Sequence, residues 1–231
     1  MPLDKVGILY SGGKDSNFTI YNTLKEGYDV LLLTIIPKSA ESMLFHYPNI
    51  EYVNMQAKCM NLSLIEERVD ANTLEQEMLA LFKILKIARD EGIKKIYSGG
   101  IASRFQNERF RVICNKLGLE YGAPLWKRDQ KEYMYELLDL GFRFIIDAVA
   151  AYGLDDKWLG RLIDKDAVDE LIRLSIRYGF NVTFEGGEAE SFVIDAPHFK
   201  KMIVIDDARI EWDGVRGVYK ITKASIEKKI Y

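Results

Sequence analysis

The chain has 231 residues, of which 48% are hydrophobic and 29% are charged, and this balance excludes a disordered or collagen-like protein. Its 32 basic and 35 acidic residues give a net charge of -3, which argues against broad nucleic-acid binding, so no direct nucleic-acid partner is expected. The sequence has no signal-like segment and no apolar run near the roughly 18 residues that span a bilayer. We therefore expect a cytoplasmic protein without a membrane partner. Two distant cysteines, Cys59 and Cys114, lack metal-site or redox spacing and are expected to be buried thiols.

The first half of the chain alternates apolar runs with amphipathic stretches, which is the pattern of βαβ units and a parallel sheet. The expected strands are 5–10, 30–36, 63–68, 94–97 and 120–125. The expected helices are 17–26, 51–61, 73–91 and 106–117, the last ending at Gly118. The sequence therefore predicts an α/β fold around a Rossmann-like parallel sheet.

Beyond residue 125 the pattern changes to that of a smaller α+β unit. Helices are expected at 131–140 and 166–178, around the apolar run 142–151 and a loop at 153–161. Short strands are expected at 181–184, 191–194 and 202–205. We therefore predict two domains, 1–125 and 126–231.

The stretch Ser-Gly-Gly-Lys-Asp-Ser at 11–16 follows the first strand and opens a helix. Gly12 and Gly13 allow backbone N–H groups to approach anionic oxygens, and the helix N-terminus adds free donors and a positive dipole end. Lys14 supplies a positive charge, while the hydroxyls of Ser11 and Ser16 can donate hydrogen bonds. The stretch predicts a phosphate site, and the plainer alternative is a glycine-rich turn that caps a helix.

Asp15 is unusual in an anion site, and it fits either a magnesium ligand or a residue that fixes the helix start. The loop lacks the Gly-x-x-x-x-Gly-Lys-Ser/Thr spacing of a Walker A motif, which serves hydrolysis at the γ-phosphate. Ser98, Gly99 and Gly100 follow another expected strand and should face the same crevice. They fit close approach of an adenosine or an acceptor, or a simple strand-to-helix turn.

Gln106 and Arg109 share a helix face, where Arg109 fits a phosphate or carboxylate contact as well as it fits a surface salt bridge. Later in the chain, Glu185, Glu188 and Glu190 surround the pair Gly186-Gly187, which permits a sharp turn. Converging carboxylates suit a positively charged ligand such as magnesium, and the alternative is a solvated acidic turn.

The stretch at 11–16 resembles the PP-loop of the N-type ATP pyrophosphatases, which split ATP between the α- and β-phosphates. Motifs across the rest of the chain resemble the diphthine-ammonia ligase family: Pro-Leu-Trp-Lys-Arg-Asp-Gln at 124–130, Gly-Leu-Asp at 153–155, Trp-Leu-Gly-Arg at 158–161, Glu-Gly-Gly-Glu-Ala-Glu-Ser at 185–191 and Asp-Ala-Pro at 195–197. One departure is Ala189, where many relatives have an aromatic residue. The resemblance implies a sheet of the adenine nucleotide alpha hydrolase type in 1–125 and an acceptor-binding domain in 126–231.

The resemblance also implies an activity: ATP-dependent amidation of diphthine on translation elongation factor 2 to diphthamide. Diphthine bears a quaternary ammonium, and under this resemblance the carboxylates at 185–190 would bind either that group, magnesium or the incoming ammonium ion. Ammonium would supply the nitrogen, and an acyl-adenylate would form with release of AMP and pyrophosphate. ATP and magnesium are the expected cofactors, with Asp15 as the metal ligand. The roles expected under this resemblance are catalysis by Lys14, Asp15 and Glu188, nucleotide binding by residues 11–16 and 98–100, and substrate binding by Gln106, Arg109, Glu185, Gly186, Gly187, Glu188 and Glu190.

Two alternatives stay open from the sequence. One is another PP-loop enzyme, such as a tRNA-modifying enzyme, although the thiolases among these commonly show cysteine pairs and basic extensions that this chain lacks. The other is a non-catalytic adenine-nucleotide sensor. The sequence also leaves homo-oligomerisation open.

Overall fold

The computed structural model describes residues 4–38, 42–45, 48–70, 73–101 and 103–229. The first half forms a five-stranded sheet in the order β3-β2-β1-β4-β5, in which every pair of neighbours is parallel. Its strands are β1 (Lys5–Leu9), β2 (Asp29–Pro37), β3 (Ser63–Val69), β4 (Lys95–Ser98) and β5 (Glu120–Gly122). The predicted parallel α/β sheet is confirmed.

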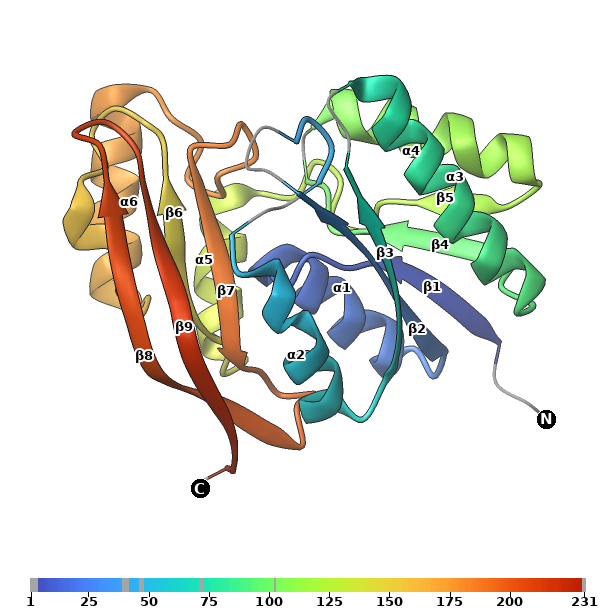
Figure 1. The fold of residues 1–231 in the computed structure, drawn as a ribbon. Helices are drawn as coiled ribbons and strands as arrows, with labels where there is room; N and C mark the ends of the chain where they lie inside the picture. Colours follow the sequence, from blue (N-terminus) through green and yellow to red (C-terminus); the bar gives the residue numbers. More distant parts are fainter. Residues whose placement is uncertain (1–3, 39–41, 46–47, 71–72, 102, 230–231) are drawn as a thin grey trace.

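Helices cover both faces of this sheet because its strands are apolar on both faces (Figure 1). Leu32 packs into the core with α1 (Lys14–Lys25) and α2 (Val53–Met60), which the short helix η1 (Ile50–Tyr52) precedes. The next residue, Leu33, points the other way and packs with α3 (Leu74–Asp90) and α4 (Arg104–Leu117). No helix of the described residues is long and apolar enough to cross a membrane.

The second half forms a four-stranded sheet in the order β7-β6-β9-β8, and its strand pairs are antiparallel. Its strands are β6 (Arg143–Val149), β7 (Ala189–Asp195), β8 (Lys201–Trp212) and β9 (Gly217–Lys228), and its helices are α5 (Gln130–Asp139), η2 (Asp156–Trp158) and α6 (Lys165–Tyr178). In Figure 1, α1 and α2 lie between the two sheets. One continuous hydrophobic core joins them, so the proposed division at residue 125 does not coincide with a break in packing.

Two expectations for the second half are wrong. Residues 181–184 form a turn, because the Asn181 side chain accepts hydrogen bonds from both the N–H and the hydroxyl of Thr183, and Phe184 has a φ of 68°. The expected strand at 202–205 extends to Trp212 and returns as β9, which the sequence reading missed. The Asp213-Gly214 pair that turns this hairpin is a sequence signal that could have revealed it.

Asn49 connects the first half of the chain to the second sheet. Strands β6 and β9 pair through only two residue pairs, Ala148 with Val218 and Val149 with Gly217. Beyond that point the buried Asn49 amide donates to Asp147 Oδ2 at 2.8 Å and to the Tyr219 carbonyl at 2.9 Å. Its Oδ1 accepts from the N–H of Ile221 at 2.8 Å. The side chain thus replaces ladder hydrogen bonds between two strands and fixes the segment that leads into α2.

Replacing this amide should destabilise the protein. Asn49 has a φ of 52°, so Asn49→Gly removes the side chain without adding backbone strain. We expect a loss of about 3 kcal/mol in the free energy of unfolding, because buried partners lose their hydrogen bonds. Chemical denaturation measures the change. Asn61→Gly is the matched control, since Asn61 is exposed and has a φ of 58°, and an equal loss in both variants would contradict the role of the Asn49 amide.

His198 makes the core sensitive to acid. Its ring packs against Tyr21, Phe142 and Phe199, and neither ring nitrogen has a hydrogen-bond partner among the described residues. Burial, with a smaller contribution from the charges of Lys229 and Lys200, lowers its pKa from 6.5 to about 3. The unfolded chain therefore binds a proton at a pH where the folded chain does not.

The stability that neutral His198 contributes is present above pH 6.5 and is lost as the pH falls from 6.5 towards 3. The expected loss is about 1.4 kcal/mol for each pH unit in that window. Unfolding of wild type and His198→Phe should be compared at several pH values, because Phe cannot titrate. The variant should lose stability less steeply with acid, and parallel pH curves for the two proteins would refute this account.

Candidate functional site

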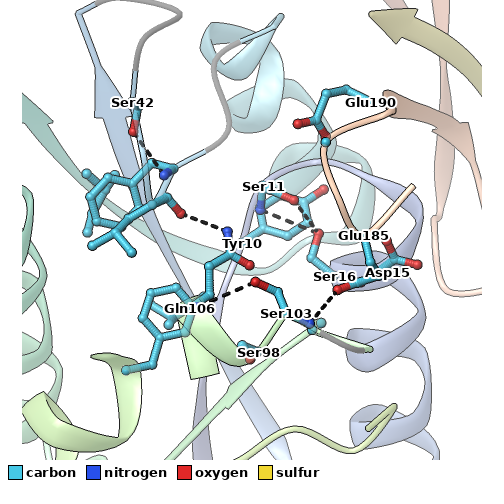
Figure 2. Close-up of a pocket in the computed structure, with 18 of the residues that line it drawn as sticks. Tyr10, Ser11, Asp15, Ser16, Ser42, Ser98, Ser103, Gln106, Glu185 and Glu190 are labelled. Carbon is cyan, nitrogen blue, oxygen red and sulfur yellow. Dashed lines mark hydrogen bonds between the residues drawn. The ribbon is translucent and has the colours of Figure 1, made fainter. Parts of the chain in front are cut away.

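A cavity of about 510 Å³ opens where the first loop meets the carboxyl ends of β1, β2 and β4. Figure 2 shows the polar side chains that line it, with Ser42 and Gln106 on one side and Glu185 and Glu190 on the other. The predicted site residues among its lining are Ser11, Asp15, Ser16, Ser98, Gly99, Gly100, Gln106, Glu185, Gly186, Gly187 and Glu190. Residues far apart in the sequence are thus brought to one crevice, at the place where open α/β sheets bind ligands.

Helix α1 begins in this crevice at Gly13, which has no side chain to cap it, although the N–H of Lys14 donates to the hydroxyl of Ser191 at 3.2 Å. By contrast, the helices α3, α4, α5 and α6 begin with side chains that accept backbone N–H bonds, namely Thr73, Ser103, Asp129 and Asp164. The first N–H groups of a helix have no partner within the helix, and an anion can satisfy them. Ser11 and Ser16 lie beside them, with their hydroxyl oxygens 3.2 Å apart. The start of α1 therefore has the donors that a phosphate group needs.

The second sheet holds this loop in place. The N–H of Val193 in β7 donates to the carbonyl of Gly12 at 3.1 Å. The buried amide of Gln56 donates to the same carbonyl at 2.9 Å and to the Val193 carbonyl at 2.7 Å, while Tyr10 donates its hydroxyl to Gln56 Oε1 at 2.7 Å. The sequence reading missed both supporting side chains. Nothing around Gln56 in the sequence distinguishes it from an ordinary helix residue.

Lys14 is buried, with a relative exposure of 2%, and does not line the cavity. Its ammonium donates to the carbonyl of Thr183 at 2.7 Å and to Asp15 Oδ2 at 2.9 Å, and it lies over the Phe184 ring. The other Asp15 oxygen accepts from the hydroxyl of Tyr133 at 2.8 Å. Burial and this carboxylate hold the pKa of Tyr133 well above its usual value, so Tyr133 stays a donor. Asp15 is therefore fixed between a cation and a phenol.

The three carboxylates of the acidic turn at 185–190 have different surroundings: two accept backbone hydrogen bonds, and two border the cavity. Glu185 accepts from the N–H groups of Ile101 at 3.0 Å and Ser103 at 3.2 Å, which ties the turn to the segment after β4. Glu188 accepts from the N–H of Asn181 at 2.9 Å and from that of Gly186 at 2.7 Å, and it is not among the residues that line the cavity. The carboxylate of Glu188 thus closes its own turn, whereas Glu190 borders the open space (Figure 2).

Gln106 and Arg109 also differ in position, although both lie on α4. Gln106 donates to the carbonyl of Leu44 at 3.1 Å and lines the cavity. Arg109 donates to the carbonyl of Phe105 at 2.8 Å, stacks 3.4 Å from the centre of that ring and does not line the cavity. The buried carboxylate of Glu77, which the sequence reading missed, accepts from the N–H groups of residues 43 and 44 at 3.0 Å each. Side chains of helices α3 and α4 therefore fix residues 43 and 44, which form one side of the cavity.

A magnesium ion fits this site as a companion of phosphate and not as an ion bound by protein alone. The described residues contain no group of three or more His, Cys, Asp or Glu side chains that could hold a metal. Asp15 offers a single carboxylate at the cavity wall. Magnesium commonly binds through one or two carboxylates together with substrate phosphates. Both oxygens of Asp15 already accept hydrogen bonds, from Lys14 and Tyr133, so the residues present are compatible with magnesium only as an ion that arrives with the phosphates.

Comparison with known proteins identifies the family. A family model described as the diphthamide synthase N-terminal domain matches residues 4–121, and one described as the diphthamide synthase C-terminal domain matches residues 129–226. The chain belongs to the diphthamide synthase family. Diphthamide synthase relatives include the diphthine–ammonia ligase of Mus musculus, 32% identical over 225 residues that cover 88% of this chain and 84% of that protein. The human diphthine–ammonia ligase is 31% identical over 227 residues, covering 89% and 84% of the two chains.

Among solved structures, a predicted subunit of a tRNA methyltransferase from Methanocaldococcus jannaschii superposes with a TM-score of 0.47 at 17% identity. It covers 84% of this chain and 98% of that one. At the level of the diphthamide synthase family, the relatives support a ligase. Ala189, the departure noted in the family motif, is buried and pairs with Val149 in the second sheet.

Proposed function

We propose that this protein amidates diphthine on translation elongation factor 2, using ATP and ammonium and releasing AMP and pyrophosphate. The observation that carries the proposal is the shared cavity, in which an uncapped helix start faces the acidic turn of the second domain. Such an arrangement can hold an anionic polyphosphate and a cationic acceptor side by side. Family membership supports the same class of reaction.

In the proposed reaction, the terminal carboxylate of diphthine attacks the α-phosphorus of ATP. The bond between the α- and β-phosphates breaks, pyrophosphate leaves and an acyl-adenylate forms. The nitrogen of ammonia then attacks the acyl carbon, the carbon–oxygen bond to AMP breaks, and a proton is released. No covalent bond to the enzyme is needed, so the side chains act by positioning and by stabilising charge.

The residues of this chain divide these tasks. The N–H groups at the start of α1, with the hydroxyls of Ser11 and Ser16, would bind the phosphates that become pyrophosphate. Lys14, whose buried ammonium contacts the Asp15 carboxylate and the Thr183 carbonyl, would stabilise the charge that accumulates there once its ammonium turns towards the bound phosphates. The segment 98–100 would receive the adenosine side of the nucleotide. Glu185 and Glu190 would face the acceptor.

Magnesium, when bound, would neutralise phosphate charge, and Asp15 would hold it directly or through water. Glu188 was expected to be catalytic. Because its carboxylate accepts two backbone hydrogen bonds, we propose a positioning role for it instead. By closing the turn on Asn181 and Gly186, it would position its neighbours Glu185 and Glu190. Arg109 would contact the substrate only if its side chain leaves the Phe105 carbonyl.

The deciding experiment incubates the protein with diphthine-bearing elongation factor 2, ATP, magnesium and ammonium. Mass spectrometry of the factor should show conversion of the carboxylate to the amide, with one AMP and one pyrophosphate for each amide formed. Release of ADP and orthophosphate, or an unconverted factor in the presence of folded protein that binds ATP, would refute the proposal. A control with unmodified factor should give no AMP.

A further inference from the structure

A second cavity, also of about 510 Å³, adjoins the first. It lies between Ser42, Phe45 and Pro48 on one side and the end of the second sheet where β8 turns into β9 on the other. Four residues line both cavities: Ser42, Phe45, Gly187 and Glu190. A molecule seated in the second cavity can therefore meet one seated in the first across this shared wall.

An aromatic face and carboxylates line the second cavity. Trp212 is partly buried, and it packs so closely on Gly217 that a Cβ atom at residue 217 would lie 2.6 Å from the indole ring. Glu211 and Asp213 flank Trp212 in the chain and also line the cavity, together with Glu190 from the acidic turn. An aromatic ring with nearby carboxylates is the combination that binds quaternary ammonium groups.

The charge of this cavity is fixed by local contacts. The N–H groups of Val215 and Arg216 donate to Asp213 Oδ1 at 2.8 and 2.7 Å. These hydrogen bonds lower the pKa of the Asp213 carboxyl, so it remains ionised at neutral pH. Arg209 forms an ion pair with Glu211 at 2.7 Å, which offsets part of the charge, and the guanidinium of Arg216 lies on the same lining. The cavity therefore offers both signs of charge beside an aromatic ring.

We propose that the second cavity binds the acceptor side chain by its quaternary ammonium group, with Trp212 as the aromatic wall, and directs its carboxylate across Glu190 and Gly187 to the nucleotide. This inference rests on the proposed function, because it assumes that the acceptor carries both groups. Two features single out this occupant: the continuity of the two cavities, and the aromatic and acidic lining of the second. Trp212 thus determines acceptor specificity, while the first loop serves ATP.

The test has a binding arm that does not depend on turnover. Glycine betaine is the probe, because it carries a trimethylammonium group and a carboxylate, and 3,3-dimethylbutanoate is its isostere without the positive charge. Betaine should change the tryptophan fluorescence of the wild-type protein. Trp212→Phe should lack the part of this change that comes from Trp212. The isostere should bind about 10-fold more weakly. Equal binding of both probes, or an unchanged betaine response in the variant, would overturn the assignment.

The kinetic arm measures KM for the modified factor and for ATP separately. Trp212→Ala should raise KM for the factor about 10-fold and leave KM for ATP unchanged, and Trp212→Phe should recover most of the loss. Ile210→Ala is the control, because Ile210 is exposed on the same strand and lines neither cavity. A rise in KM for ATP, or none for the factor, would overturn the inference. If the wild-type protein binds betaine at Trp212 but does not amidate the factor, the proposed function is refuted and the assignment of the second cavity as a quaternary ammonium site is not.

Discussion

Lys14→Met should lower kcat for amidation about 100-fold, which corresponds to about 2.7 kcal/mol of lost transition-state stabilisation. The ammonium is buried and contacts the Asp15 carboxylate at 2.9 Å, so its charge acts in surroundings that screen it little. Removing it leaves the Tyr133 hydroxyl as the remaining side-chain hydrogen-bond partner of the Asp15 carboxylate among the described residues. Steady-state assays over a range of ATP concentrations measure the effect.

A structural role for Lys14 makes a different prediction. Its ammonium also donates to the carbonyl of Thr183, so Met at this position leaves a buried acceptor without that bond. If the residue only joins the two halves of the chain, the variant should lose thermal stability and keep kcat. Lys14→Arg retains the charge but not its compact geometry, and should recover part of kcat. A Lys14→Met protein with wild-type kcat would contradict the proposed catalytic role of Lys14.

The parallel sheet was predictable because its signals are local. Each strand is a short apolar run, and each helix between strands carries an amphipathic pattern that needs no knowledge of distant residues. The strand expected at 5–10 is β1, and the helix expected at 73–91 is α3, whose N-cap Thr73 accepts from the N–H of Gln76. The C-terminal sheet was harder because β8 and β9 carry mixed polar and apolar residues on a half-exposed hairpin.

The loop at 11–16 was recognisable as a candidate phosphate site for the same reason, since its glycines, lysine and serines are consecutive. The hydrogen bonds that hold this loop could not be predicted. Gln56 and Val193, which donate to the Gly12 carbonyl, are 44 and 181 residues away from Gly12 in the sequence and meet it only in the folded chain. The acidic turn was predicted as one unit, yet its members point in different directions. A sequence shows three glutamates close together, and only the geometry shows that Glu188 is occupied by two backbone N–H groups.

Gly99 and Gly100 look equivalent in the sequence, and the structure separates them. A Cβ atom at Gly99 would lie 2.6 Å from the backbone nitrogen of Ser16 and 2.7 Å from the carbonyl carbon of Asp15. A Cβ atom at Gly100 would meet only the hydroxyl of Ser98, at 3.7 Å. The absence of a side chain at Gly99 therefore lets the end of β4 press directly against the first turn of α1, where the phosphate donors lie.

Gly99→Ala should accordingly push the first turn of α1 away from the cavity. We expect a loss of about 2 kcal/mol in stability from overpacking. We also expect a roughly 100-fold loss in kcat/KM for ATP, because a shift of about 1 Å in a positioning group costs that much. Denaturation curves and ATP kinetics measure the two effects. Gly100→Ala controls for stability and should stay within about 0.5 kcal/mol of wild type. Equal stability and equal kcat/KM for Gly99→Ala and wild type would show that β4 does not set the position of the phosphate loop.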